Sequence, residues 1–257
     1  MMKVVILAGG FGTRLSEETE IKPKPMIEIG DQPLLMHIMR NFAAQGFDEF
    51  VICLGYKGYI IKEYFANLRF HLNDLHFESL DSDALPLKNF ELNWKVDLID
   101  TGLSTLTGGR LKRIRELTCG ETFIMTYGDG LADIDIAKLV DFHQTAGSAA
   151  TVTAVSPPAR FGALEIDASG KVLAFNEKVD NDSNWINGGF FVLEQEVFDY
   201  IEGDATTWEK EPLIRLSELN RLSAYKHLGF WKPCDTLREK RELEELWKTG
   251  APWKNWD

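Results

Sequence analysis

The first half of this chain alternates short apolar runs with amphipathic stretches, and this alternation limits the possible folds more than any other feature. Val4–Ala8 and Phe50–Leu54 are apolar throughout and contain β-branched residues, as buried strands do. Between them, Pro33–Ala44 places apolar residues at the i, i+3, i+4, i+7 spacing of a helix. Strands that alternate with helices predict βαβ units and a parallel sheet covered on both faces. The same pattern predicts helices at Tyr59–Ala66, Gly109–Leu117 and around Ile136–Val140, and strands at Val96–Ile99, Thr122–Tyr127 and Ala150–Val155.

After about residue 156 the pattern changes, but no linker rich in Pro, Gly or Ser separates the two halves. We therefore predict one α/β domain over residues 1–257 with a C-terminal extension. Leu68–Asn93 has weak periodicity and is either an inserted loop or an oligomer contact. The elements expected in the second half are short strands at Ala163–Ile166, Val172–Phe175 and Gly189–Leu193, and helices near Gln195–Ile201, Pro212–Leu219 and Thr236–Lys248.

Composition disfavours several classes of protein. The net charge of −12 argues against a nucleic-acid partner, which needs a basic face, but a few local cations still allow a small anionic substrate. No run approaches the ~20 apolar residues of a membrane span, and the N-terminus lacks a signal-peptide pattern, so we expect a cytoplasmic protein. The three cysteines are widely spaced and form no CxxC pair, which favours reduced structural residues.

A glycine-rich loop follows the first predicted strand. Gly9, Gly10 and Gly12 surround Phe11, and Thr13 and Arg14 come next. Glycines at this position let backbone N–H groups approach phosphate oxygens closely. The loop is neither a Walker A motif, because Thr-Arg follows Gly12, nor a GxGxxG fingerprint, because Leu15 stands at the third glycine position. A turn that serves only chain geometry remains the alternative.

The segment "KPKPM" follows ten residues after the loop and contains Lys24 between two prolines. Prolines restrict the backbone to an extended course, so they orient Lys24 more strictly than a free surface lysine. The loop and the oriented cation together predict a phosphate-binding site.

The combination of "LAGGFGTRL" and "KPKPM" resembles the sugar nucleotidyltransferases, the pyrophosphorylases that make NDP-sugars. The resemblance covers nearly the whole chain and is closest to the members that use CTP and glucose 1-phosphate. It implies a Rossmann-like, mixed but mainly parallel sheet flanked by helices, with residues 1–155 forming mainly the nucleotide-binding core and residues 156–257 the sugar-phosphate-binding part. The segments that extend it are "DTGLSTLTGGRLKR", "TYGDGLADID", "RFGALEID", "NEK", "INGGFFVL", "DATTWEKEPL" and "GFWKPCDT".

The resemblance implies that Asp129 and Asp235 bind Mg²⁺, a hard cation that takes one or two carboxylates along with phosphate oxygens and water. The alternatives are a turn residue for Asp129 and the N-cap of the last helix for Asp235. The catalytic residues implied are Arg14, Lys24, Asp129 and Asp235. The nucleotide-binding residues implied are Leu7, Ala8, Gly9, Gly10, Phe11, Gly12, Thr13, Arg14, Lys24, Thr105, Arg110 and Asp129.

Three further residues, Glu177, Lys178 and Asn187, are implied for the sugar phosphate. Related sequences often read Glu-Lys-Pro where this chain has Val179, and losing the proline would loosen the loop that carries Lys178. An ordinary exposed charge pair is the alternative for Glu177 and Lys178. The substrates implied are CTP and glucose 1-phosphate, and we expect a homo-oligomer without nucleic-acid or membrane partners.

Base selection is assigned to Arg110. A side chain that only donates hydrogen bonds matches O2 and N3 of cytosine but not the N3–H of uracil or thymine. The alternative is that Arg110 starts a basic helix and lies in solvent. Two rival functions also remain. One is an enzyme of the same family that uses UTP or dTTP, instead of CTP, with glucose 1-phosphate. The other is a non-catalytic sensor of nucleotide sugars. The sensor predicts that a metal-binding aspartate or the lysine is missing, yet Asp129, Asp235 and Lys24 are all present.

Overall fold

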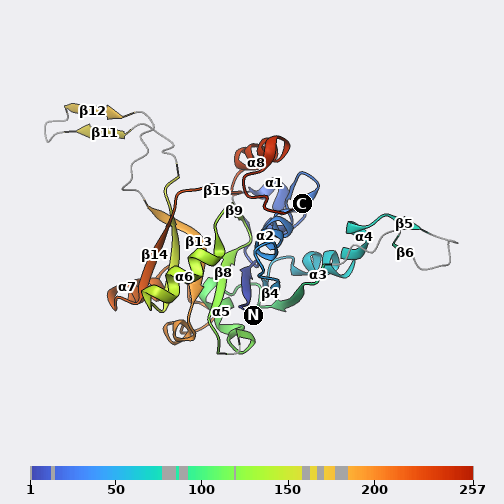
Figure 1. Cartoon of the computed structure of the whole chain (residues 1–257), viewed down its shortest axis with the longest axis horizontal. Coiled ribbons are helices and arrows are strands. Elements are labelled where there is room, and N and C mark those ends of the chain that lie inside the picture. The colour runs from blue at the N-terminus through green and yellow to red at the C-terminus, as the bar shows by residue number, and fades with distance from the viewer. Residues whose placement is uncertain are drawn as a thin grey trace.

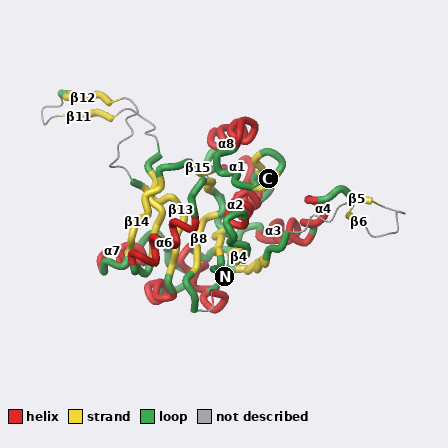
Figure 2. The backbone as a smooth tube through the Cα atoms, in the orientation of Figure 1, coloured by secondary structure: helices red, strands yellow, loops and turns green. Residues whose placement is uncertain are grey.

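A seven-stranded mixed sheet forms the centre of the computed structural model, which describes residues 2–12, 15–76, 85–86, 92–118, 120–157, 163–166, 171–176 and 185–256. The strand order is β14-β10-β13-β8-β1-β4-β7 (Figures 1 and 2). β1 is parallel to β4 and β8, β4 to β7, and β10 to β14. β13 is antiparallel to both of its neighbours. The strands are β1 (Val4–Leu7), β4 (Glu49–Leu54), β7 (Lys95–Asp100), β8 (Phe123–Tyr127), β10 (Ala150–Val155), β13 (Ile186–Leu193) and β14 (Leu222–His227).

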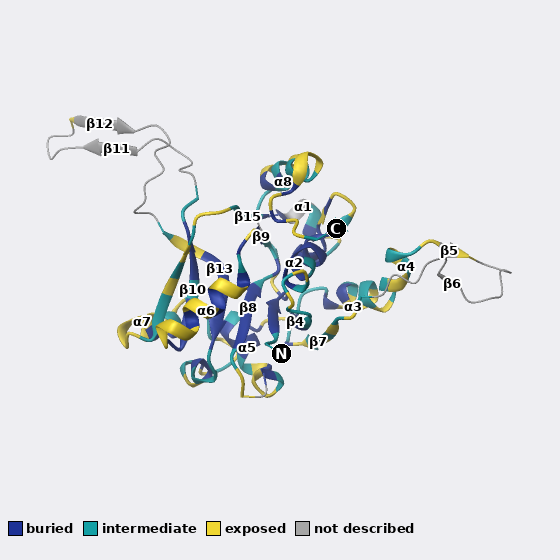
Figure 3. Ribbon diagram, viewed as in Figure 1, coloured by how far each residue is buried: buried dark blue, intermediate teal, exposed yellow. Residues whose placement is uncertain are grey.

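Helices cover both faces of this sheet, as the alternation predicts. Side chains alternate between the faces, so Val4 and Ile6 belong to one buried cluster and Val5 and Leu7 to the other. The first cluster includes side chains of α2 (Leu34–Ala43), α3 (Gly58–Ala66), α6 (Ile136–Ala146) and α8 (Leu237–Gly250). The second includes those of α5 (Thr107–Arg113), α7 (Glu211–Glu218) and the 3-10 segment η4 (Gln195–Tyr200). Figure 3 shows the central strands buried, whereas α8 has buried, intermediate and exposed positions.

Short elements outside the sheet complete the described chain. β5–β6 lies within the segment Leu68–Asn93, and both it and β11–β12 extend away from the sheet (Figure 1). No helix of the described residues has the length and apolar character that crossing a bilayer requires. The remaining elements are α1 (Ser16–Thr19), η2 (Lys24–Met26), β2 (Glu28–Ile29), β3 (Gln32–Pro33), α4 (Leu68–Leu72), β5 (Leu75–His76), β6 (Leu85–Pro86), η3 (Arg115–Thr118), β9 (Gly130–Ala132), β11 (Ala163–Ile166), β12 (Val172–Asn176) and β15 (Trp231–Pro233).

The predicted elements are present, and most differ from the observed ones by one to three residues at an end. The helix predicted at Gly109–Leu117 is interrupted at Ile114, where α5 gives way to η3, and the one predicted near Gln195–Ile201 is the 3-10 segment η4. Over one or two turns, periods of 3.0 and 3.6 residues cannot be told apart from the positions of apolar residues. β14 was not predicted. It is an edge strand whose side chains are only partly buried or exposed, so it lacks a continuous apolar run.

The C-terminal segment packs against α2 after α8 ends. Trp253 is fully buried, and its carbonyl accepts a hydrogen bond from the amide of Asn41 at 2.7 Å. The ring of His37 donates through Nε2 to the carbonyl of Ile29 at 2.9 Å and accepts at Nδ1 from the indole of Trp253 at 3.3 Å. This arrangement requires a neutral imidazole, and burial lowers the pKa of His37 below its ordinary value of 6.5.

Two of the three cysteines lie within the described residues. Cys53 and Cys234 are buried and form no disulfide, as expected of reduced structural residues. Burial raises the pKa of each to about 12, so both thiols stay protonated at neutral pH. Cys119 lies outside the described residues.

Candidate active site

The glycine-rich loop leaves the carboxyl end of β1, which lies inside the sheet between β8 and β4. A Cβ atom at Gly9 would lie 2.2 Å from Nη1 of Arg110, and Gly12 has a φ of +65°, so both positions favour glycine. The ring of Phe11 lies 5.3 Å from that of Tyr56 and is half exposed. Thr13 and Arg14 lie outside the described residues.

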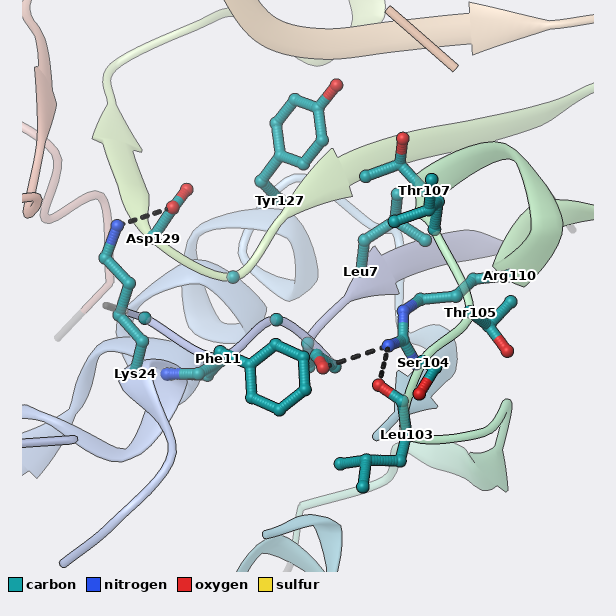
Figure 4. Close-up of a pocket in the computed structure, with 17 residues that line it drawn as sticks. Leu7, Phe11, Lys24, Leu103, Ser104, Thr105, Thr107, Arg110, Tyr127 and Asp129 are labelled. Carbon is teal, nitrogen blue, oxygen red and sulfur yellow. Dashed lines mark hydrogen bonds and ion pairs between the residues drawn. The ribbon is translucent and has the colours of Figure 1, made fainter. Parts of the chain in front are cut away.

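The loop forms one wall of a cavity of about 330 Å³. Figure 4 shows Lys24 and Asp129 at one end of this cavity, Arg110 at the other end and Phe11 between them. Such a cleft at the carboxyl ends of strands is the usual ligand position in α/β sheets. Every described residue predicted to bind nucleotide lines it: Leu7, Ala8, Gly9, Gly10, Phe11, Gly12, Lys24, Thr105, Arg110 and Asp129.

At one end of the cavity, the ammonium group of Lys24 pairs with two carboxylates. Its Nζ lies 2.7 Å from Oδ2 of Asp129 and also pairs with Oδ1 of Asp235. Burial alone would lower the pKa of Lys24, but the charge and hydrogen bonds of the two aspartates outweigh it and place the pKa above its ordinary value. The lysine is therefore charged at neutral pH.

Pairing of two short strands brings these aspartates together, although they are far apart in the sequence. β9 begins directly after Asp129, β15 ends two residues before Asp235, and Gly130 pairs with Pro233 in the antiparallel ladder. The amide of Cys234 also donates to the carbonyl of Asp129 at 2.8 Å. The two-stranded sheet formed by β9 and β15 thus brings both carboxylates beside Lys24.

The start of α8 leaves the carboxylate of Asp235 available to Lys24. The N-cap is Thr236, whose hydroxyl accepts a hydrogen bond from the amide of Glu239 at 3.2 Å. The carboxylate of Glu239 accepts in turn from the amide of Asp235 at 2.9 Å. The alternative in which Asp235 itself caps this helix is wrong.

The extended course predicted for "KPKPM" is correct only at its start. Pro23 is extended, with a ψ of 150°, but Lys24–Met26 form the 3-10 turn η2. The amide of Met26 donates to the carbonyl of Pro23 at 2.8 Å, which closes the turn. A proline φ near −65° suits a 3-10 turn as well as an extended chain, so the two prolines alone could not distinguish them.

Within the described residues, no group of three or more His, Cys, Asp or Glu side chains could hold a metal ion. Asp129 and Asp235 are the predicted pair, and they already attract one cation, the ammonium of Lys24. Two carboxylates suit Mg²⁺, which usually keeps several waters and takes its other ligands from substrate phosphates. The carboxylates of Asp129 and Asp235 are therefore suitable ligands for the predicted Mg²⁺ ion.

Arg110 lies at the opposite end of the cavity and is only 4% exposed, so the alternative that places it in solvent is wrong. Its Nη1 donates to Leu54 O at 2.9 Å, to Thr101 Oγ1 at 2.8 Å and to Gly102 O at 2.8 Å. Its Nη2 donates to Gly9 O at 3.0 Å. The guanidinium group thus ties the glycine-rich loop to the segment after β7, and recognition of the base by Arg110 stays a prediction.

A second cavity, of about 340 Å³, adjoins the first, and Tyr127 and Asp129 line both. Asn187, predicted to bind the sugar, lines this cavity together with Asp235. The side chain of Asn187 accepts a hydrogen bond from the amide of Gly189 at 2.8 Å, which orients it. Glu177 and Lys178 lie outside the described residues.

The structure also adds residues that the sequence did not single out. Tyr127, in the wall between the cavities, donates its hydroxyl to Glu209, and Thr107 of the first cavity donates to the same carboxylate at 2.6 Å. Burial and the charge of Glu209 raise the pKa of Tyr127 well above its ordinary value. The resembling segments contain all three residues, but no motif or spacing indicated that they meet.

Comparisons with known proteins identify relatives that match this chain over all or nearly all of its length. Glucose-1-phosphate cytidylyltransferase of Salmonella typhi is 54% identical over 258 residues, which span all of both chains. The probable glucose-1-phosphate cytidylyltransferase of Bacillus subtilis (strain 168) is 44% identical over 99% of this chain and 100% of its own. Among solved structures, HddC from Yersinia pseudotuberculosis complexed with GMP-PN has the same fold, with a TM-score of 0.69 at 24% identity over 96% of this chain and 100% of that one.

The family assignment rests on a match along most of the chain. The sequence profile of the family described as nucleotidyl transferase matches residues 3–228, which include the glycine-rich loop, Lys24 and Asp129. With this match and the full-length relatives, the chain belongs to the nucleotidyl transferase family.

Proposed function

We propose that this protein transfers a cytidylyl group from CTP to α-D-glucose 1-phosphate, giving CDP-glucose and pyrophosphate. The observation that carries the proposal is the meeting of two cavities at one charged cluster, because Asp129 lines both and Asp235 lines the second. A transfer between two bound phosphates needs such a junction. The relatives that span the whole chain and carry the name glucose-1-phosphate cytidylyltransferase support this choice of substrates.

The reaction needs no general base from the protein. A phosphate monoester has a second pKa of about 6, so the acceptor is mostly ionised at neutral pH and can attack the α-phosphorus directly. The obstacle is the approach of two polyanions, and catalysis consists mainly of positioning and charge neutralisation. In this proposal the N–H groups of the glycine-rich loop bind the triphosphate, and Lys24 and Arg14 neutralise the departing pyrophosphate.

Asp129 and Asp235 would hold Mg²⁺. When bound, the ion supplies positive charge to phosphate oxygens beyond what the side chains can provide. In this proposal the two aspartates would hold the ion at the junction of the cavities, where the reacting phosphates would meet.

The second cavity is the proposed site of glucose 1-phosphate. Asn187 and Glu209 present polar groups to it, and Trp231 lines it with an indole whose N–H donates to the carbonyl of Gly188 at 2.7 Å. A few placed polar groups beside an aromatic surface suit a sugar ring. Glu177 and Lys178 remain predicted to bind the sugar phosphate, and one domain, a cytoplasmic location and a homo-oligomer also stay predictions.

A substrate grid tests the proposal. CTP, UTP, dTTP and ATP are each combined with several sugar 1-phosphates and Mg²⁺, and pyrophosphate release is measured. We expect the highest kcat/KM with CTP and glucose 1-phosphate, and at least a 100-fold lower value for Asp235→Asn with the same pair, or about 2.7 kcal/mol. A preference for UTP or dTTP would establish the alternative donor. Binding without pyrophosphate release in any combination would favour the sensor and refute the proposed transfer.

A further inference from the structure

Lys24 occupies the place between the two aspartates that a divalent cation would need. Its ammonium pairs with Oδ2 of Asp129 at 2.7 Å and with Oδ1 of Asp235. Mg²⁺ binds carboxylate oxygens at about 2.0–2.1 Å, so it cannot share the same two oxygens with an ammonium group. The two cations therefore compete for the pair of carboxylates.

The surroundings of Lys24 keep its ammonium at this place. The side chain is only 10% exposed, and its backbone is held in the turn η2 between Pro23 and Pro25. Moving the ammonium away from both carboxylates within this partly buried site would break two ion pairs, which is unfavourable. A metal ion that binds without a nucleotide must displace the ammonium, and its net binding free energy is weaker by this amount.

A nucleotide changes the balance because Lys24 also lines the first cavity, together with Gly9, Gly10 and Gly12. Phosphate oxygens bound there would give the ammonium a second set of anionic partners within reach of the same stem. Once Lys24 pairs with phosphate, the carboxylates of Asp129 and Asp235 lose their cation, and their combined charge attracts a divalent ion.

We propose that the Lys24 ammonium acts as an internal substitute for the divalent cation in the nucleotide-free enzyme, so that metal binding at Asp129 and Asp235 depends on the nucleotide. This inference rests on the proposed function, since it assumes that a nucleoside triphosphate binds in the first cavity. It gives Lys24 two successive partners: the aspartates before the substrate binds, and the phosphates afterwards.

Binding of Mn²⁺ without nucleotide tests the inference, with free Mn²⁺ followed by electron paramagnetic resonance. Lys24→Met keeps the length of the side chain but removes the competing charge, and we expect at least about a 10-fold lower Kd for Mn²⁺ than in the wild type. Lys24→Arg keeps the charge and should retain weak binding. Asp235→Asn combined with Lys24→Met should abolish the gain.

Lys22→Met is the matched control. Lys22 lies two residues earlier and pairs with Glu28 at 2.9 Å, away from the aspartates, so its loss should leave the Kd for Mn²⁺ unchanged. Circular dichroism and urea unfolding check that each variant folds, and Lys24→Gln replaces Lys24→Met if the latter does not. Equal or weaker Mn²⁺ binding in a folded neutral variant would overturn the inference.

The assay separates this inference from the proposed function. Pyrophosphate release by the wild type together with unchanged Mn²⁺ affinity in Lys24→Met refutes only the competition by Lys24. Tighter Mn²⁺ binding in Lys24→Met, with no pyrophosphate release by the wild type from any substrate pair, supports the competition and refutes the transfer.

Discussion

Replacement of Arg110 by methionine should destabilise the protein by about 2–4 kcal/mol, because it removes the donors that join the glycine-rich loop to the segment after β7. Hydrogen bonds from a charged group contribute about 1.5–3 kcal/mol each, so the four bonds of 2.8–3.0 Å would sum to more than this. Two acceptors keep other donors, however: Leu54 O retains the amide of Thr101 and Gly9 O retains that of Tyr56. The variant also no longer buries a charge, which lowers the net loss further.

Urea unfolding of the wild type, Arg110→Met and Arg113→Met measures this effect. Arg113 lies on the same helix, but its ion pair with Asp204 is exposed to solvent, so its loss should have a much smaller effect. Equal unfolding midpoints for the two variants would refute the structural role of Arg110. The same Arg110 variant tests base recognition: its kcat/KM should fall more with CTP than with UTP, and equal losses would contradict that prediction.

Three further changes have expected outcomes. A Cβ at Gly109 would lie 2.5 Å from Cα of Asp204, so Gly109→Ala should lower the free energy of unfolding by about 1–3 kcal/mol and lower the thermal midpoint. The control is Gly10→Ala, whose Cβ would meet open space and which should leave the thermal midpoint unchanged. His37 is buried and neutral, whereas in the unfolded chain it binds a proton below a pH of about 6.5, so the free energy of unfolding should fall as the pH drops below this value. Urea unfolding at several pH values should give a shallower slope of unfolding free energy against pH for His37→Gln than for the wild type. Glu209→Gln weakens the hydrogen-bond acceptor for Tyr127 beside the second cavity. It should raise the KM for glucose 1-phosphate by about 10-fold, or about 1.4 kcal/mol. An equal rise in the KM for CTP would count against a place for Glu209 in the sugar site.

Much of the architecture could be predicted because its signals are local. Val4–Leu7 and Phe50–Leu54 are buried on both faces of the sheet and therefore apolar throughout, and α2 shows its buried stripe in the sequence. The antiparallel direction of β13 was not visible, since an apolar strand has the same composition in either direction. β14 was missed because an edge strand needs less apolar surface.

The candidate site also contains some residues that could be identified from the sequence and others that could not. The glycines of the loop could be identified from the sequence because the chain turns and approaches Arg110 closely there, and side chains larger than hydrogen at Gly9 would collide. Asp129 and Asp235 could be named only through resemblance, because the ladder of β9 and β15 that joins them leaves no periodic signal in such short strands. Thr107, Tyr127 and Glu209 meet through packing between distant segments.

By itself, the sequence determined the α/β class, the position of the glycine-rich loop and the placement of Lys24 between two prolines, whereas Asp129 and Asp235 were named through resemblance. The first three follow from short-range rules: apolar periodicity, the conformational freedom of glycine and the restricted backbone of proline. Only the tertiary structure decided that the Lys24 ammonium lies between both carboxylates, that Arg110 is buried against backbone carbonyls, and that two cavities meet at Asp129. The physical reason is that each of these contacts joins segments distant in sequence, whose distances are set by strand pairing and core packing rather than by any local pattern.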